Sequence, residues 1–302
     1  MIRCPLCKNS RGTFFHEIHI YKYYLCDFCQ TLFLYPIPKQ INIDKFYEDD
    51  FDYSAGFAQE VYIRRRAHTI FHNLRKLNPQ GISLLDVGSG YGYFLDELNK
   101  RGLKTTGLEP SKRLYAYSKK HFNLHVLPET FENYSSHGKK YDFITLIHVI
   151  EHVTDPLQTI QKAMSMLNKE GILFIETPNL DSHLFASEQK NYTFLLVPDH
   201  IWIFSLKSFS KLFEKIKEIK IEKSSTYSQS EHCMGILKHS SKMIVQMEAS
   251  RNIEQKNIKK DKLSNLSRIK ILLFDKGLAK ILTPLLNIRN KGSVLEMYVN
   301  VS

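Results

Sequence analysis

The sequence predicts an α/β fold in which helices cover both faces of a mostly parallel sheet. Short apolar runs alternate with helical stretches between residues 83 and 225, which is typical of a parallel sheet. Two Cys-x-x-Cys pairs, at 4–7 and 26–29, come before this alternation and predict a small ribbon. A long Lys-rich stretch at 235–290 interrupts it and predicts a basic helical insert before the last strand.

The composition is that of an ordinary globular protein with one large domain and small appendages. Of 302 residues, 43% are hydrophobic and 24% are charged, which suffices for a proper core. The sequence shows neither a charged leader followed by an apolar stretch nor an apolar run of about 18 residues. We therefore expect a cytoplasmic protein, in which thiols stay reduced and paired cysteines bind metal.

The four N-terminal cysteines predict a metal site. Cys4 and Cys7 lie on one tight turn and Cys26 and Cys29 on another, 18 residues further on. Four thiolates from two such turns form the closed tetrahedral shell of structural zinc, with Zn–S distances of about 2.3 Å. Because a closed shell leaves no coordination position open, we expect zinc to stabilise the ribbon rather than to take part in catalysis.

Periodicity and boundary residues justify each element of the sheet domain. A helix is expected at 59–77, ended by Asn78-Pro79. Apolar or alternating runs predict strands at 83–87, 104–108, 124–127, 141–147, 171–176, 219–225 and 294–301. Helical periodicity predicts helices at 93–100, 112–121, 156–167 and 206–215. The expected division is ribbon 1–40, linker and N-terminal helix 41–80, sheet domain 81–234, insert 235–290 and last strand 291–302.

A glycine turn follows the first strand of the sheet domain and predicts a nucleoside cofactor. In Asp86-Val-Gly-Ser-Gly-Tyr-Gly92, the glycines Gly88, Gly90 and Gly92 let the backbone turn sharply and approach a ligand closely. Glu109 ends the next strand, 23 residues after Asp86, where a carboxylate can bind both hydroxyls of a ribose. The spacing is not the dinucleotide G-x-G-x-x-G, so a nicotinamide cofactor is disfavoured.

These motifs resemble the class I S-adenosylmethionine-dependent methyltransferases. The resemblance rests on four blocks in order, 86–92, 107–111, 141–153 and 167–179, and covers about residues 80–225 and the last strand. It implies a seven-stranded Rossmann-like sheet with a reversed last strand and S-adenosylmethionine as cofactor. It also implies cofactor contacts from Asp86, from the turn at Gly88–Gly92 (methionine end), from Glu109 (ribose), from 128–131 (adenine) and from His148 (edge of the methyl-donor pocket).

A ribbon ahead of such a domain is similar to the sugar C-methyltransferases that act on nucleotide-linked deoxysugars, and to relatives in surface-polysaccharide pathways. Tyr53-Ser-Ala-Gly-Phe57 is similar to their aromatic linker, and residues 198–205 resemble their Glu-His block, which supplies the base. Asp199 stands where that family has Glu, and the insert replaces their large C-terminal domain. The resemblance implies methylation of a sugar, nucleotide sugar or surface-glycan precursor and makes Tyr53, Asp199 and His200 catalytic candidates.

Methyl transfer from an activated sulfonium requires an aligned nucleophile and removal of its proton. His200, with Asp199, is the first candidate base because an imidazole titrates near neutral pH, and His152 beside Glu151 is the second. A purely structural role stays open for both histidines. His148-x-x-Glu151-His152 is also similar to the Glu-x-x-Glu-His cluster of quinone-biosynthesis O-methyltransferases, so a divalent ion and a small-molecule O-methylation remain alternatives.

The basic insert carries much of the net charge of +11, because 242–291 holds twelve Lys and Arg against four acids. Three interpretations of the insert are open. It could be a solvated helical face, a surface that contacts an anionic membrane near a lipid-linked glycan, or a phosphate-binding surface. An RNA methyltransferase is the second hypothesis, since some ribosomal-RNA guanine methyltransferases begin with a four-cysteine zinc module. The distance of the basic charge from the ribbon and the lack of an Asp-Pro-Pro-Tyr motif disfavour nucleic acid. The third hypothesis for the function is a non-catalytic partner protein that keeps the methyltransferase fold.

Overall fold

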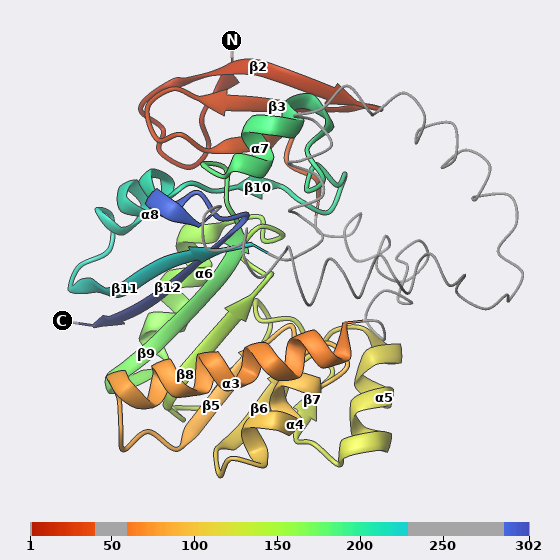
Figure 1. Ribbon diagram of the computed structural model, residues 1–302, viewed down its shortest axis with the longest axis vertical. Coiled ribbons are helices and arrows are strands. Elements are labelled where there is room, and N and C mark those ends of the chain that lie inside the picture. The colour runs from red at the N-terminus through yellow and green to blue at the C-terminus, as the bar shows by residue number, and fades with distance from the viewer. Residues whose placement is uncertain (1, 40–58, 229–286, 302) are drawn as a thin grey trace, which may run out of the picture. The chain divides into compact units, whose positions relative to one another are not determined.

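The computed structural model describes residues 2–39, 59–228 and 287–301 (Figure 1). Tyr53 and Cys233 lie outside these ranges, as does most of the expected insert at 235–290. The chain forms two compact units, one of Met1–Thr177, Leu196–Ser224 and Glu296–Ser302, the other of Pro178–Leu195 and Ser225–Leu295. The ribbon and the expected cofactor residues all belong to the first unit.

The ribbon is an antiparallel sheet that also takes in a strand from far along the chain. Its order is β1 (Ile2–Arg3), β2 (Arg11–Ile18), β3 (Tyr21–Cys26), β4 (Leu32–Tyr35) and β10 (Trp202–Ile203). The strands β2 and β3 form a hairpin whose turn places His19 at a φ of 54°. Leu32, Phe33 and Leu34 of β4 are fully buried, so this strand forms the inner part of the ribbon.

The second sheet has seven strands and is mostly parallel, which confirms the expected fold class. Its order is β11 (Ile219–Tyr227), β12 (Val294–Val301), β9 (Leu167–Pro178), β8 (Tyr141–Ile147), β5 (Ser83–Val87), β6 (Lys104–Leu108) and β7 (Val126–Leu127). The pairs β5–β6, β5–β8, β6–β7 and β8–β9 are parallel. Figure 1 shows β12 running opposite to its neighbour β9, as expected for a reversed last strand.

Helices and short 3-10 turns connect these strands. They are α3 (Glu60–Leu77), α4 (Tyr93–Asn99), α5 (Lys112–Phe122), α6 (Pro156–Ser165), α7 (His183–Glu188), η1 (Gln189–Asn191), α8 (Leu206–Phe213) and η4 (Ile288–Asn290). Side-chain caps define where two of these helices begin. At the start of α6, Asp155 accepts a hydrogen bond from the amide of Gln158, and at the start of α8, Ser205 and Ser208 form a reciprocal capping box. The helices α3 and α4 bury an apolar face in one core cluster with strands β5, β8 and β9.

Several element boundaries differ from the sequence-based expectation. Leu167 begins β9 instead of ending the preceding helix, because it pairs with Tyr141 before the register shifts. The strand expected at 124–127 is shorter, and β10 was not expected at all. Since β5, β6 and β8 are parallel, their carboxyl ends meet at one edge of the sheet, and that edge carries Asp86, Glu109 and His148.

Candidate cofactor and catalytic site

The glycine turn after β5 wraps the end of the neighbouring strand β6. The amides of Gly88 and Ser89 both donate to the Leu108 carbonyl over 2.9 Å. Gly88, Gly90 and Gly92 have φ values of 70°, 56° and 83°, a region that side chains other than glycine rarely adopt. A Cβ atom on Gly90 would have no atom within 4 Å, so at this glycine the backbone faces open space. This is where a ligand can approach the main chain closely.

Glu109 ties the glycine turn to the segment after β6. One of its carboxylate oxygens accepts from the amide of Gly90 over 2.7 Å and the other from the amide of Ser111 over 2.8 Å. Burial raises the pKa of Glu109 to about 7, although these two backbone donors act in the opposite direction. Each oxygen keeps a second lone pair, so the carboxylate can also accept from the two hydroxyls of a ribose.

Asp86 lies beneath the turn and is also buried. It accepts from the Thr145 hydroxyl of β8 over 2.6 Å, and burial raises its pKa to about 7, with the charge of Glu109 adding to the effect. The Ser89 hydroxyl is buried and has no hydrogen-bond partner among the residues that the structure describes. Carboxylates and an unsatisfied hydroxyl around an open backbone position are what a polar cofactor would complement. The residues present therefore fit a nucleoside cofactor.

His148 begins the segment that follows β8, and two carboxylates flank its ring. Its φ is 52°; Nδ1 lies 3.0 Å from Glu151 Oε1, and Nε2 lies 3.7 Å from Glu176 Oε1. Burial opposes a charge on His148, but the hydrogen bond to Glu151 and both nearby carboxylates outweigh it and raise its pKa. Glu176 is in turn bound by Arg66 of α3, which also pairs with Glu296 over 2.7 Å. Arg66, Glu176 and Glu296 were not expected from the sequence, whose signals were an acid at the end of the apolar run at 171–176 and an acid inside the expected last strand at 294–301.

His152, Asp199 and His200 lie together although 46 residues of the sequence separate His152 from the adjacent pair Asp199 and His200. His152 Nδ1 lies 2.8 Å from Asp199 Oδ1, and the two imidazole rings meet edge to face with centroids 4.7 Å apart. Burial alone would lower the pKa of His152, but the charge and hydrogen bond of Asp199 raise it to about 9. Burial and the charge of His152 lower the pKa of His200 to about 4. The cluster therefore holds one basic and one neutral imidazole.

The Asp–His pairing differs from the expected one in its geometry. Asp199 was expected to pair with His200, but their side chains are 4.0 Å apart, and the shorter contact is to His152. Ligand-type atoms of Glu151, His152 and His200 lie within 4.8 Å of one another, whereas His148 is not part of this group. The segment that follows β8 lies close to the glycine turn. A Cβ atom added to Gly88 would lie 2.9 Å from the Cγ2 atom of Val149. The histidine cluster thus begins beside the candidate cofactor site.

The four ribbon cysteines have the geometry of a closed metal shell. The sulfur atoms of Cys4 and Cys29 are 3.7 Å apart, those of Cys7 and Cys26 are 3.6 Å apart, and all four lie within 4.8 Å of one another. Sulfurs at about 2.3 Å from a tetrahedral zinc ion would be separated by about 3.8 Å. The hydrogen bond from Cys4 lowers the pKa of Cys29 to about 5, although burial opposes this effect. The donor set therefore fits zinc.

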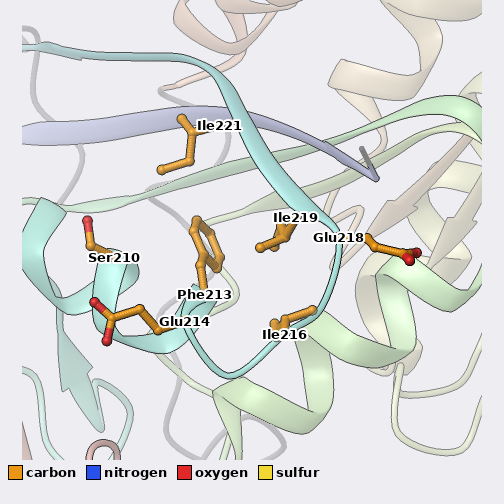
Figure 2. Close-up of a pocket in the computed structure, with 7 residues that line it drawn as sticks. All are labelled: Ser210, Phe213, Glu214, Ile216, Glu218, Ile219 and Ile221. Atoms are coloured by element: carbon orange, nitrogen blue, oxygen red, sulfur yellow. The ribbon is translucent and has the colours of Figure 1, made fainter.

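A hollow elsewhere in the first unit contains none of the predicted site residues. It lies between α8 and the start of β11, and its lining is Ser210, Phe213, Glu214, Ile216, Glu218, Ile219 and Ile221. Figure 2 shows Phe213 and Ile219 between Ile221 and Ile216 in this view, an apolar floor without a histidine or cysteine. In the part of the chain that the structure describes, no helix has both the length and the hydropathy to cross a membrane.

Comparisons with known proteins support the methyltransferase interpretation. Ubiquinone biosynthesis O-methyltransferase of Actinobacillus pleuropneumoniae serotype 7 (strain AP76) is 28% identical over 149 residues, 45% of this chain and 60% of the relative. The protein of the same name from Coxiella burnetii (strain Dugway 5J108-111) is 28% identical over 131 residues, 41% of this chain and 56% of the relative. The chain thus matches at most about 60% of the length of these curated relatives.

Solved structures agree on the fold. The plantazolicin methyltransferase BpumL, solved in complex with SAH, matches with a TM-score of 0.53 and 15% identity, over 86% of this chain and 94% of that one. The plantazolicin methyltransferase BamL matches with a TM-score of 0.51 and 14% identity, over 85% and 94%. The model of the family described as "Methyltransferase domain" matches residues 61–216, more than half of the chain. The protein therefore belongs to the methyltransferase domain family, and the expectation of a class I methyltransferase is confirmed at that level.

Proposed function

We propose that the protein transfers a methyl group from S-adenosylmethionine to a hydroxyl group of a small-molecule acceptor, and that this acceptor is a sugar, a nucleotide sugar or a surface-glycan precursor. The observation that carries the proposal is the hydrogen bond between Asp199 and His152, because His152 is on the segment that begins beside the glycine turn. We also propose a reducing, cytoplasmic location, because the four ribbon thiols would bind zinc there.

The glycine turn and Glu109 form the cofactor side of the site. When bound, S-adenosylmethionine supplies a methyl group on a positively charged sulfur, which needs no further activation. The open space beside Gly90 suits close contact with the cofactor, and Glu109, which the Gly90 amide holds in place, would accept hydrogen bonds from the ribose hydroxyls. Asp86 and the unsatisfied Ser89 hydroxyl add polar groups beneath the turn. His148 lies at the edge of this region.

His152 is the base that we propose for removing the hydroxyl proton. Asp199 holds the Nδ1 atom, so the other ring nitrogen is the one that exchanges a proton with an acceptor. With its pKa raised to about 9, His152 is a stronger base than an ordinary imidazole once it has lost its own proton, so turnover should rise as the pH rises towards about 9. His200, the first candidate from the sequence, has a lowered pKa and is the weaker base of the two. We therefore assign His200 to the second place, and Tyr53 stays a prediction outside the described residues.

The acceptor class rests on two different observations. The order of a four-cysteine ribbon before the domain supports a sugar acceptor through its resemblance to sugar C-methyltransferases. The names of the curated relatives instead support a quinone-type small molecule as acceptor and oxygen as the methylated atom, and a catechol is a simple probe for this class. A nucleotide-linked deoxysugar and a catechol are therefore the two acceptors to compare.

The test is transfer of labelled methyl from S-adenosylmethionine by the purified protein, first to these two acceptors and then to fractions of a cell extract. We expect an acid-stable methyl ether in the sugar or glycan fraction. His152→Ala should lower kcat at least about a hundredfold, since general bases contribute about 10²–10⁴. His72→Ala, an exposed histidine on α3, is the matched control and should be active.

If the labelled methyl group appears in the catechol and not in the sugar, the proposed acceptor changes from a sugar to a phenol. Label in RNA would overturn the small-molecule acceptor and favour the second hypothesis. A protein that binds no S-adenosylmethionine in calorimetry would overturn the enzymatic function and leave the non-catalytic interpretation.

A further inference from the structure

The candidate catalytic loop (residues 199–202) runs directly into a strand of the ribbon's own sheet. The strand β10 pairs antiparallel with β4, and Trp202 lies opposite Phe33. The amide of Leu34 donates to the carbonyl of Ile201 over 2.8 Å. The backbone that follows the candidate catalytic side chains is therefore held by ladder hydrogen bonds to an N-terminal module.

One ribbon side chain reaches the loop itself. Tyr23 of β3 is fully buried, and its hydroxyl donates to the backbone carbonyl of His200 over 2.7 Å. Burial, and then the charge of Asp199, raise the pKa of Tyr23, so its hydroxyl stays a neutral donor. This hydrogen bond satisfies a carbonyl that belongs to the same residue as one of the two imidazoles.

The other side of the loop is held by the segment that carries His152. The amides of Ile201 and Trp202 both donate to the carbonyl of Glu151, over 2.9 and 3.1 Å. The indole nitrogen of Trp202 donates to the carbonyl of Val153 over 2.8 Å. The candidate catalytic loop is thus bound on one side by the ribbon and on the other by the residues around His152.

The second pair of ribbon cysteines, Cys26 and Cys29, lies where β3 ends and the connection to β4 begins. The strand β3 ends at Cys26, whose amide donates to the carbonyl of Thr31 over 3.0 Å, and β4 begins at the next residue, Leu32. Cys29 contacts the Thr31 hydroxyl over 3.3 Å. The second Cys-x-x-Cys turn therefore fixes how β3 and β4 lie side by side, and with them Tyr23.

We propose that the ribbon positions the candidate catalytic loop, and that Tyr23 is a positioning residue for the proposed methyl transfer. Tyr23 acts through the His200 carbonyl and sets the distance between Asp199 and His152. The proposal rests on the proposed function. It gives the N-terminal module a part in the chemistry beyond its own folding.

The test compares Tyr23→Phe with Tyr21→Phe in the full chain. Tyr23→Phe removes only the oxygen, whereas Tyr21 lies at the start of the same strand and has no part in the loop contacts. For Tyr23→Phe we expect kcat to fall about ten- to hundredfold, as for a small misplacement of catalytic groups. The KM for the acceptor, the S-adenosylmethionine affinity and the metal content should stay as in the wild type. The Leu34 and Ile201 amides should exchange hydrogen faster, and Tyr21→Phe should change none of these values.

Unchanged kcat and unchanged exchange at Leu34 and Ile201 in Tyr23→Phe would overturn the proposal. Should the wild type show no turnover, amide exchange alone decides, so failure of the proposed function is distinguishable from failure of this inference. Should Tyr23→Phe not fold, the wild type with its ribbon metal removed by a chelator replaces it. Faster exchange at both amides with retained cofactor affinity would then support the proposal, and unchanged exchange would contradict it.

Discussion

Gly90 donates its amide to a carboxylate oxygen of Glu109 over 2.7 Å, so the open position of the glycine turn and the candidate ribose acceptor are held together. The other Glu109 oxygen is bound by the amide of Ser111, which leaves the side chain in one orientation before any ligand arrives. These residues follow two adjacent, parallel strands, β5 and β6, so the pairing of the two strands sets their positions.

Glu109→Ala should weaken the binding of S-adenosylmethionine at least about tenfold, because two hydrogen bonds to a charged acceptor are lost. Calorimetry measures this directly, with Glu17→Ala, an exposed glutamate of β2 outside the proposed contacts, as the control. The pKa of Glu109 near 7 adds a pH effect: the carboxyl must lose its proton to accept from both hydroxyls, so affinity should fall as pH drops below about 7. Unchanged affinity in Glu109→Ala would remove this residue from the cofactor site.

Gly90→Ala should damage cofactor binding more than folding. Its positive φ should cost about 1–2 kcal/mol of unfolding free energy, and its Cβ would occupy the open space beside the turn. Gly102 is the matched control, since it also has a positive φ, 86°, and open space around its Cβ position. We expect similar losses in thermal unfolding for both variants and a loss of cofactor affinity for Gly90→Ala alone. Equal affinities would show that the open space is not the cofactor site.

Asp199→Asn should change how stability depends on pH. The pKa of His152 is raised from 6.5 to about 9, so its stabilising contribution is complete below pH 6.5 and is lost as pH rises towards 9. The contribution of His200 to stability depends on pH in the opposite direction. Because its pKa is lowered to about 4, this contribution is complete above pH 6.5 and is lost as the pH falls towards 4. Denaturant unfolding between pH 6 and about 9 should therefore show a decline in the wild type and a flatter curve in Asp199→Asn. Parallel curves would contradict the His152–Asp199 ion pair.

The ribbon should hold about one zinc ion per chain in elemental analysis. Cys29→Ser should lose the metal and lower the melting temperature, because three thiolates no longer close the shell. The fifth cysteine of the sequence offers the control, and Cys233→Ser should keep full metal content. A folded wild-type protein without metal would exclude the zinc site.

Much of the fold could be predicted because its signals are local. The strands at 83–87, 104–108, 141–147 and 294–301 have the expected bounds, since apolar runs and alternation along a short stretch fit strands of a buried sheet. The glycine turn and the acid after the next strand could be recognised for the same reason. Their residue types are required by backbone conformation and by hydrogen bonding over a short stretch.

The candidate catalytic pair could not be predicted in the same way. Residues next to each other in the sequence suggested Asp199 with His200, but the side chain of Asp199 turns to His152. Arg66, Glu176 and Glu296 come from α3, β9 and β12, and no spacing in the sequence connects them. Such contacts depend on how distant elements pack, which a local pattern does not contain.

The sequence by itself determined the fold class, the four-cysteine ribbon and the glycine turn, because each is encoded by periodicity, by thiol spacing or by glycines. The tertiary structure alone decided which imidazole Asp199 holds and that the ribbon supplies the neighbour of β10. The physical reason is that strand pairing and burial bring together groups more than 40 residues apart in the sequence, and only there do their charges set each other's pKa.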